Sequence, residues 1–330
     1  MKTLLVVGGC GFVGSHMVKA LFDKGHRIVI LDDLSTGYRD SLFGGELVVG
    51  SCGDRKVLDD IFSRYTFDGV IHFASLIQVG ESVVDPARYY TANVCNAVTL
   101  LGAMAEHNVK VMVFSSTAAV YGTPNQTPID EYHPCNPINP YGRSKWFVEN
   151  ILQDFDRAYG LRSVSLRYFN AAGADPQSRI GERHEPETHL IPLAIGAALE
   201  TRPPLTVFGN DYDTPDGTCI RDYVHVDDLA AAHMLALEYL WEEGKTTVFN
   251  LGNGAGFSVE QVIKTVERVA GRPVPRSYGP RRPGDPQRLV ASAEKAKKML
   301  RWRPQYTTVD DMVKHAWNFE CAQQKAKQGS

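Results

Sequence analysis

Tyr141 and Lys145 are the two residues whose types and spacing best suit this sequence to proton transfer. They lie four residues apart at the start of a predicted helix that follows Asn139-Pro140, so their side chains share one helix face. A free tyrosine has a pKa of about 10 and is a poor base at neutral pH, but a nearby ammonium group favours its phenolate. The pair could therefore supply a general base, although the same spacing also occurs on ordinary solvated helices.

Thr117 lies 24 residues before Tyr141, just after a predicted strand over residues 110–115. In doubly wound sheets, ligands bind at the carboxyl edge, where this segment would lie. A threonine hydroxyl there can relay a proton or hold a substrate hydroxyl, or it can simply bond its own backbone. A hydroxyl at a strand end followed by Tyr-x-x-x-Lys is the reductase-type triad. We therefore predict Thr117, Tyr141 and Lys145 as catalytic.

A glycine-rich turn follows the first predicted strand and opens a helix. Gly8 permits the tight turn, Gly11 lets the backbone approach a pyrophosphate, and Gly14 allows close packing of helix on strand. The free N–H groups and positive dipole end of the helix then face the phosphates. The turn therefore predicts a dinucleotide site, although a glycine pattern by itself is a weak signal.

Asp32 strengthens that interpretation. It ends the second predicted strand, 18 residues after Gly14, close to the ~20 residues expected for an acid that binds the adenosine ribose hydroxyls. The residues after it are Asp33, Leu34 and Ser35, with no arginine for a 2′-phosphate. This arrangement favours NAD over NADP.

Alternating strands and helices would position these residues. Apolar runs without clean alternation indicate strands buried on both faces, as in a helix-covered parallel sheet. We predict strands over 3–7, 27–31, 46–49, 69–73, 110–115, 162–167 and 247–251, and helices near 12–24, 55–64, 86–107, 141–159, 189–200, 226–241 and 258–270. Ser258 and Gln261 form a possible capping box. Two short helical stretches and a frayed polar tail from Ala322 are expected at the end of the chain.

The expected fold class is α/β, with a doubly wound, Rossmann-like parallel sheet and a smaller, interleaved α/β substrate-binding domain. Residues 1–169, with return segments near 223–251, would form the NAD-binding domain. Residues 170–330, rich in Pro, Gly and Asp over 170–222, would mainly bind substrate.

Composition excludes several classes of protein. The 330 residues include 35 basic and 38 acidic ones, a net charge of -3, which argues against a nucleic-acid binder. The six cysteines are at least 40 residues apart, so CxxC metal or redox pairs are excluded, no metal site is expected, and a cytoplasmic location is predicted. No apolar run approaches a signal-peptide core or the ~20 residues of a membrane span.

Longer motifs make the sequence resemble the extended short-chain dehydrogenase/reductase family, and more narrowly its UDP-glucose/UDP-galactose 4-epimerases. The resemblance extends from Val6 to about Trp317. It is carried most specifically by residues 72–74, 79–82, 89–90 with Asn93, 167–170, 208–212 with Thr214, 216–218, 221–226 and 250–252.

The resemblance implies roles for individual residues. Those implied to bind NAD are Gly8, Gly11, Phe12, Val13, Gly14, Asp32, Ser35, Phe73, Ala74, Asn93, Tyr141, Lys145 and Tyr168. Those implied to bind a UDP-sugar are Thr117, Asn170, His189, Leu190, Phe208, Arg221, Arg282, Asp285 and Leu289. An arginine is well suited to bidentate contacts with a diphosphate.

The implied reaction is reversible oxidation of the sugar at C4, with Tyr141 as the base and tightly bound NAD as the hydride carrier. The 4-keto sugar would turn over about its diphosphate link before the hydride returns. The resemblance also implies a homodimer formed through the helical stretches 86–107 and 141–159.

Three residues depart from the family pattern. Ile77 replaces a frequent lysine, His189 a common asparagine, and Leu289 a tyrosine that often closes the hexose pocket. These changes leave sugar preference open. The usual Gly-Asp near the adenine is either Gly50-Ser51 or the shifted Gly53-Asp54.

The residues after Thr117 bear on related reactions. Nucleotide-sugar 4,6-dehydratases place an Asp-Glu pair after the active-site threonine and decarboxylases carry a Glu there, whereas this chain has Ala118-Ala119. Epimerases of UDP-N-acetylhexosamines, UDP-pentoses or UDP-uronates remain alternatives. A non-catalytic, NAD-binding regulatory protein is the alternative from a different class, and the retained triad argues against it.

Overall fold

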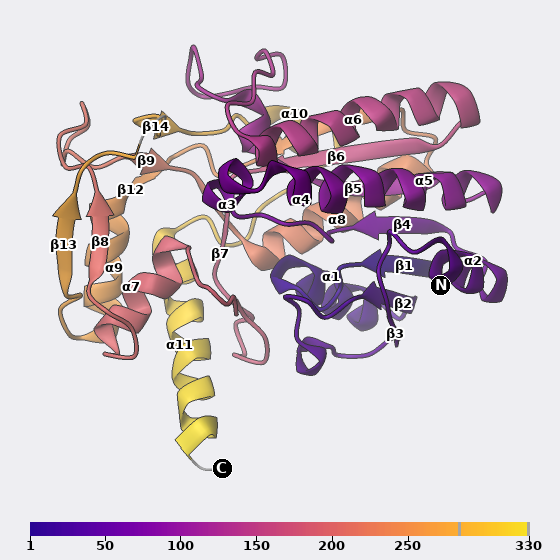
Figure 1. Cartoon of the computed structure of the whole chain (residues 1–330). Coiled ribbons are helices and arrows are strands. Elements are labelled where there is room, and N and C mark those ends of the chain that lie inside the picture. The colour runs from indigo at the N-terminus through magenta and orange to yellow at the C-terminus, as the bar shows by residue number, and fades with distance from the viewer. Residues whose placement is uncertain (283–284, 329–330) are drawn as a thin grey trace.

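A parallel sheet forms the centre of the molecule in the computed structural model, which describes residues 1–282 and 285–328 (Figure 1). Within those residues its strand order is β11-β6-β5-β4-β1-β2-β3, and every neighbouring pair is parallel. The strands are β1 (Thr3–Val7), β2 (Arg27–Asp32), β3 (Glu46–Val49), β4 (Gly69–His72), β5 (Val111–Thr117), β6 (Arg162–Tyr168) and β11 (Thr247–Leu251). This sheet, which reverses its order between β1 and β4, confirms the doubly wound α/β fold.

Helices cover both faces of the sheet, as alternating residues of β1 show. Leu4 and Val6 pack with α1 (Phe12–Asp23) and α8 (Val226–Trp241), whereas Leu5 and Val7 pack with α2 (Arg55–Arg64), α5 (Asn96–Glu106) and α6 (Pro140–Tyr159). Short elements complete this half: η1 (Arg39–Ser41), α3 (Val79–Val84), α4 (Pro86–Tyr90), the π-helical η2 (Thr91–Cys95) and η3 (Ala118–Tyr121).

A smaller region lies beyond the carboxyl ends of the central strands, toward which their arrowheads point (Figure 1). Its small sheets pair β7 (Asn170–Ala172) with β10 (Tyr223–His225), β8 (Leu205–Phe208) with β13 (Arg276–Gly279), and β9 (Ile220–Arg221) with both β12 (Phe257–Ser258) and β14 (Arg288–Leu289). The helices α7 (Leu190–Ala198), α9 (Val259–Ala270) and α11 (Val309–Gln328) share one core, and α10 (Glu294–Met299) packs near β11.

Most predicted elements are present, including the capping box of Ser258 and Gln261 on α9. The strand β11 returns from the carboxyl-terminal half to pair with β6, so the two halves interleave. Where one domain ends and the next begins stays a prediction.

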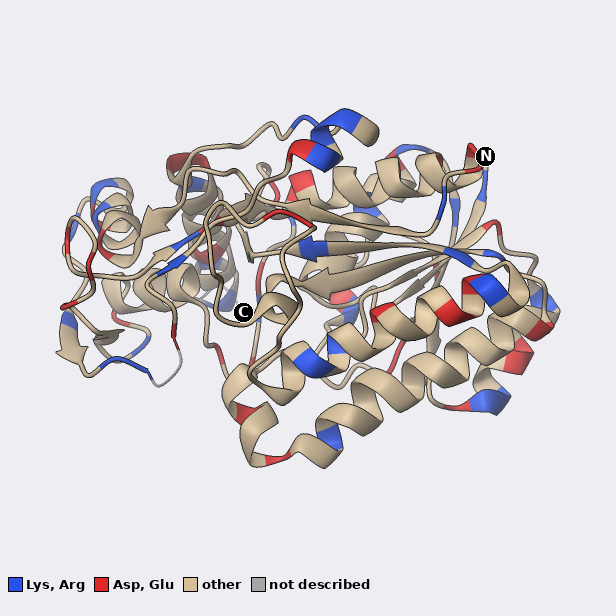
Figure 2. Cartoon of the chain, turned by 90° about the horizontal axis from the view of Figure 1, so that it is seen from above, with Lys and Arg blue, Asp and Glu red and all other residues tan. Residues whose placement is uncertain are grey.

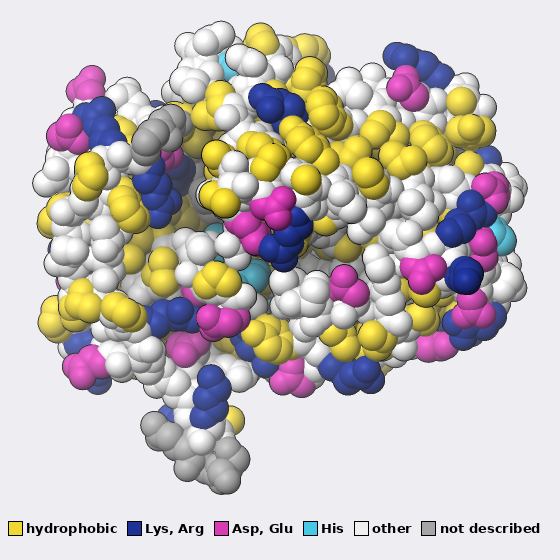
Figure 3. Space-filling model, in the orientation of Figure 1, with side chains coloured by type: hydrophobic (Ala, Val, Ile, Leu, Met, Phe, Trp, Pro, Cys, Tyr) yellow, Lys and Arg dark blue, Asp and Glu magenta, His cyan; other side chains and the backbone are white. Residues whose placement is uncertain are grey.

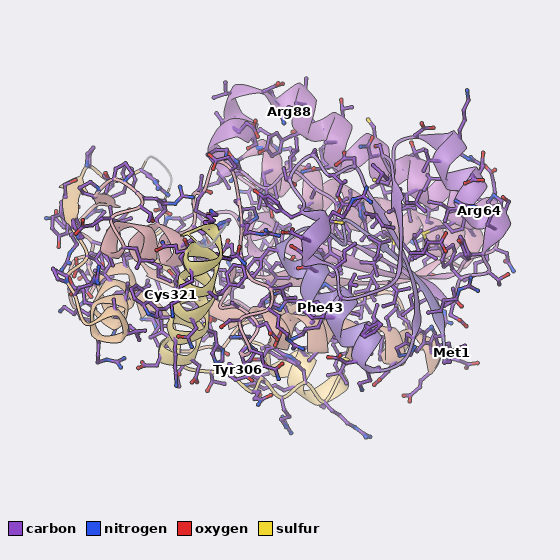
Figure 4. The ribbon with its side chains drawn as sticks, turned by 90° about the horizontal axis from the view of Figure 1, so that it is seen from below. Met1, Phe43, Arg64, Arg88, Tyr306 and Cys321 are labelled. Atoms are coloured by element: carbon purple, nitrogen blue, oxygen red, sulfur yellow. The ribbon has the colours of Figure 1, made fainter. Side chains whose placement is uncertain are left out.

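The end of the chain differs from the prediction. Instead of a second short helix and a frayed tail, α11 runs for 20 residues to Gln328. Met312, Val313 and Phe319 are buried, so packing against the smaller core holds the first turns of a helix whose sequence is otherwise polar. Figure 4 shows α11 from below, with Cys321 on it and Met1 and Arg64 at the opposite end of the molecule.

Basic and acidic residues are interspersed along the outer helices rather than separated (Figure 2). Among residues 1–282 and 285–328, no helix combines the length and apolar character that a bilayer crossing requires.

Candidate active site

The predicted cofactor residues meet at the carboxyl edge of the central sheet. Gly8 follows β1 with φ +80°, and a Cβ there would lie 2.4 Å from the backbone nitrogen of Ala74, which follows β4. A Cβ on Gly14 would lie 2.1 Å from the carbonyl oxygen of Gly8. Gly11 differs, because its nearest neighbour would be 3.6 Å away. Gly8 and Gly14 are therefore required by the chain itself, whereas the space beside Gly11 remains open for a ligand.

Asp32 is oriented toward this turn by the backbone. Its carboxylate accepts hydrogen bonds from the N–H groups of Cys10 (2.8 Å) and Leu34 (2.9 Å). Burial raises the pKa of the Asp32 carboxyl, and these two bonds oppose the rise. Ser35 is exposed, and its hydroxyl donates to Asp33. Together with the open space at Gly11, an acid held at the end of β2 fits a dinucleotide.

Asp54 has a local structural role. Its carboxylate caps α2 by accepting from the N–H of Lys56, at 2.9 Å. Ser51 follows the end of β3 and accepts from the N–H of Gly53. The cap accounts for Asp54 without an adenine contact.

Asn93 supports the cofactor edge through the loop after β4. Its side chain exchanges hydrogen bonds with the backbone of Leu76 at 2.8 and 3.0 Å and donates to Ser144, and it is 2% exposed. The resemblance implies that Asn93 lines the NAD site, which stays a prediction, and in the structure its amide fixes the loop after β4. The π-helical turn at Asn93 also divides the helix predicted over 86–107 into α4, η2 and α5.

The three predicted catalytic residues come together where β5 ends and α6 begins. Asn139 caps α6 by accepting from the N–H of Gly142, which places Tyr141 in the first turn. A Cβ on Gly142 would lie 2.5 Å from the carbonyl oxygen of Ala119, so only a glycine allows so close an approach. The Thr117 side chain then lies close enough to the Tyr141 phenol to lower its pKa, against the effect of burial. Gly142 is not among the predicted residues, although it directly follows Tyr141 in the sequence.

Lys145 lies one turn further along α6 and is 2% exposed. Its ammonium donates to the carbonyl oxygen of Ser115 at 2.8 Å and lies 4.9 Å from the centre of the Phe114 ring. Burial lowers the pKa of Lys145 to about 7, while the charge of Glu149 opposes that change. The lysine is therefore held rigidly against β5.

The chain itself does not lower the pKa of the Tyr141 phenol. Burial raises its pKa, and the nearby Thr117 side chain offsets this only in part. The predicted shift toward neutral pH therefore has to come from charge that arrives with the cofactor.

Tyr168 ends β6 directly beside Thr117 in the sheet register, and its hydroxyl shares a hydrogen bond with Ser115. Behind it, Arg167 forms a buried ion pair with Glu149, at 3.0 and 3.2 Å from its Nε. Sequence reasoning missed Ser115 and Glu149, because a hydroxyl inside a strand and an acid inside a helix carry no motif of their own.

The predicted substrate residues form a second group around β9. Arg221 pairs with Leu289 across β9 and β14, and its guanidinium bonds Asp285. Asn170 donates to the backbone oxygen of Asp222 at 2.8 Å. Leu289 also packs against the residues that follow Thr117, which links this group to the catalytic residues.

Asp222 organises this group and was also missed. Its carboxylate is fully buried and accepts from the N–H groups of Asn253 (2.9 Å), Gly254 (3.0 Å) and Ala291 (3.1 Å). Burial raises its pKa. One side chain therefore joins β9, β14 and the loop after β11.

The remaining predicted residues have different partners. Arg282 lies over the Phe208 ring, 4.2 Å from its centre, at the end of β8. His189 stands at the N-cap position of α7 without a capping side-chain bond and turns its Nδ1 toward Glu182 and Glu187, and Leu190 begins the helix. Within the described residues, no hydrogen bond or ion pair links His189 to Arg221 or Asp285.

Comparison with known proteins agrees with this geometry. The model of the NAD dependent epimerase/dehydratase family matches residues 4–252. The chain belongs to this family. The resemblance and the fold class drawn from the sequence are thus confirmed, and NAD is the cofactor in the family's description.

Similar members of the NAD dependent epimerase/dehydratase family include three UDP-glucose 4-epimerases. That of Halalkalibacterium halodurans is 51% identical over 316 residues, 96% of this chain and 95% of that protein. The crystal structure from Brucella ovis in complex with NAD has 46% identity and a TM-score of 0.95, covering 97% of this chain and 98% of that one. The structure from Bifidobacterium longum with NAD+ and UDP has 39% identity and a TM-score of 0.93, covering 98% and 99%.

Proposed function

We propose that this protein interconverts UDP-glucose and UDP-galactose by reversible oxidation at C4 of the hexose, with NAD tightly bound. The observation that carries the proposal is the meeting of Thr117, Tyr141 and Lys145 beside the glycine turn. The names of the three similar epimerases support the choice of substrate.

Tyr141 would take the proton of the 4-hydroxyl at its phenol oxygen, while Thr117 orients that oxygen through its hydroxyl. When bound, NAD would supply the hydride acceptor and donor that reversible oxidation at C4 requires. Gly8, Gly11, Asp32 and the loop held by Asn93 would bind it. Lys145, fixed by Ser115, would place positive charge near the reacting oxygens.

Arg221 and Arg282 would bind the uridine diphosphate from the smaller region. Arg221 is only 13% exposed at its side chain, which suits it to a desolvated, bidentate contact with phosphate. The hexose would then lie between this anchor and Thr117, with Leu289 at its side. Figure 3 shows a recess between the two regions on this side of the molecule.

Dehydration or decarboxylation fits the site less well. The residues after Thr117 are Ala118 and Ala119 in η3, and neither carries an acid that could remove water or assist loss of carbon dioxide. Within epimerisation, the medium-sized Leu289 leaves other UDP-sugars as candidates.

We also propose a cytoplasmic homodimer. All six cysteines lie within the described residues and are free, which suits a reducing compartment. Hydrophobic side chains gather over α5 and α6 in Figure 3, where Val98 is 41% and Phe147 40% exposed. A second copy of the chain would cover this face.

The direct test is to incubate the purified protein with UDP-glucose and to follow UDP-galactose by proton NMR. UDP-N-acetylglucosamine, UDP-xylose and UDP-glucuronate in parallel samples would identify the preferred sugar. Formation of no C4 epimer from any of them would contradict the proposal.

Tyr141→Phe should lower the rate of epimerisation by at least about 100-fold, because it removes the general base while keeping the half-buried ring. NAD content and UDP affinity should stay unchanged. The matched control is Tyr159→Phe at the other end of α6, where the side chain is 53% exposed. A Tyr141→Phe protein as active as Tyr159→Phe would overturn the assignment of the base.

A further inference from the structure

Residues 182–189, between β7 and α7, bring together two histidines and two glutamates. One ligand atom from each of Glu182, His184, Glu187 and His189 lies within 4.8 Å of all the others. Their side chains are 7%, 18%, 2% and 38% exposed, respectively. Four such groups are concentrated in eight residues and largely removed from water.

The spacing of these atoms fits a small tetrahedral ion. Nδ1 of His189 lies 2.8 Å from Glu182 Oε1 and 3.0 Å from Glu187 Oε1. Nδ1 of His184 lies 3.2 Å and 3.7 Å from the same two carboxylates. Ligand atoms about 2.0–2.1 Å from a tetrahedral Zn²⁺ would be roughly 3.4 Å apart, within the observed range.

The orientation of the ligands supports the same interpretation. Nδ1 of His184 is buried and has no hydrogen-bond partner, although Glu182 lies close to it. Oε1 of Glu187 accepts from the backbone N–H groups of Thr188 (2.7 Å) and His189 (2.8 Å). Hydrogen bonds from neighbouring groups to a ligand side chain hold that ligand in the orientation that a metal ion requires.

We propose that Glu182, His184, Glu187 and His189 form a binding site for a divalent transition-metal ion, Zn²⁺ in particular. Two imidazole nitrogens and two carboxylate oxygens suit Zn²⁺, whereas Mg²⁺ and Ca²⁺ prefer oxygen alone. Four protein ligands leave no open position, so the ion stabilises structure. The cysteine spacing predicts no metal site, because that spacing bears only on thiolate ligands.

The ion would join the two halves of the molecule. The His184 ring lies 6.4 Å from that of Phe12, the first residue of α1 after the glycine turn, and His189 directly precedes α7. The alternative arrangement is two imidazolium–carboxylate ion pairs, which need no metal. Zinc binding can be measured without the proposed epimerase activity, and His189 is the one proposed ligand that is also implied to bind the UDP-sugar.

Metal content distinguishes the two arrangements. Full-length protein without a histidine tag is dialysed against ZnCl₂, passed through a desalting column and measured by mass spectrometry. We expect about one Zn²⁺ per chain and a higher melting temperature than after chelation. Dialysis against MgCl₂ should leave that temperature unchanged.

His184→Gln and Glu182→Gln should each lose the retained zinc and its effect on melting. The matched control is His107→Gln, which removes a different histidine whose Nε2 lies 3.5 Å from Asp59 Oδ1. This control should keep both the retained zinc and its effect on the melting temperature. Circular dichroism and NAD content establish that each variant is folded. Equal zinc in His184→Gln and wild type, or no zinc in wild type, would overturn the proposal.

Cobalt substitution tests the site on the wild-type chain alone. Co²⁺ should give the visible bands of a tetrahedral ion without the near-ultraviolet band of cysteine thiolate ligands. A thiolate band, or an octahedral spectrum, would show that the metal binds elsewhere.

Discussion

At the scale of single residues, burial decides the charges of the catalytic pair. Lys145 is enclosed and Tyr141 is half-buried, and this burial favours the neutral form of each. His72 is likewise buried nearby, where burial and the charge of Lys145 lower its pKa to about 3. Burial therefore leaves little charge on the catalytic pair itself, and bound ligands would set the charge at which the reaction occurs.

Lys145 should make the stability of the fold depend on pH. The unfolded lysine, with a pKa of about 10.4, binds a proton that the folded lysine loses above about 7, so unfolding becomes harder as pH rises through this window. The difference in unfolding free energy between wild type and Lys145→Met should therefore rise by about 2 kcal/mol from pH 7 to 9.

Urea unfolding at several pH values would measure that difference, with NAD content determined for both proteins. Groups that titrate alike in the two proteins, such as distant histidines, make no contribution to this difference. The same pH dependence with and without Lys145 would show that the buried lysine keeps an ordinary pKa.

At the scale of elements, the glycine turn combines two requirements in one motif. Gly14 serves the packing of α1 on β1, because any Cβ would meet the backbone of Gly8. Gly11 has φ -76° and open space, so the chain itself does not require a glycine there. Gly14 is therefore required for folding, whereas Gly11 is required for the ligand.

Two alanine substitutions should separate these requirements. Gly14→Ala should destabilise the fold by about 1–3 kcal/mol and lose NAD, because backbone must move. Gly11→Ala should change stability by less than about 1 kcal/mol, yet reduce the NAD that copurifies.

Thermal melting and the dinucleotide absorbance of an acid extract would measure both effects for each protein. Loss of stability in Gly11→Ala equal to that in Gly14→Ala would contradict the distinction. Full NAD retention by Gly11→Ala would place the pyrophosphate elsewhere.

At the scale of the whole molecule, the exposed apolar face on α5 and α6 is the feature that the single chain leaves unexplained. Phe147 stacks near Tyr90, with ring centres 6.0 Å apart, yet remains 40% exposed. Val83 and Val84, in the nearby α3, are 63% and 85% exposed. Such a face is costly in water unless another surface covers it.

Phe147→Glu should therefore convert a homodimer into a monomer, because a carboxylate would be buried without a partner. Light scattering coupled to gel filtration measures the mass. Phe22→Glu on α1, where the side chain is 51% exposed on another helix, should remain dimeric. A monomeric wild-type protein would remove the proposed dimer.

The sequence by itself determined the parts that depend on neighbours along the chain. Apolar runs predicted the strands of the central sheet, and the spacing of Gly8, Gly14 and Asp32 predicted a nucleotide turn, because both follow from local geometry. The four-residue spacing of Tyr141 and Lys145 likewise placed them on one side of α6.

Only the tertiary structure decided what those residues touch. Gly142 brings Tyr141 to Thr117, Asn93 holds a loop, and Asp222 joins three segments, all through contacts between distant positions. Burial in the folded chain then raised or lowered the pKa values of the catalytic pair. Spacing in a sequence fixes which side chains share an element, whereas desolvation and partner groups arise only when elements pack together.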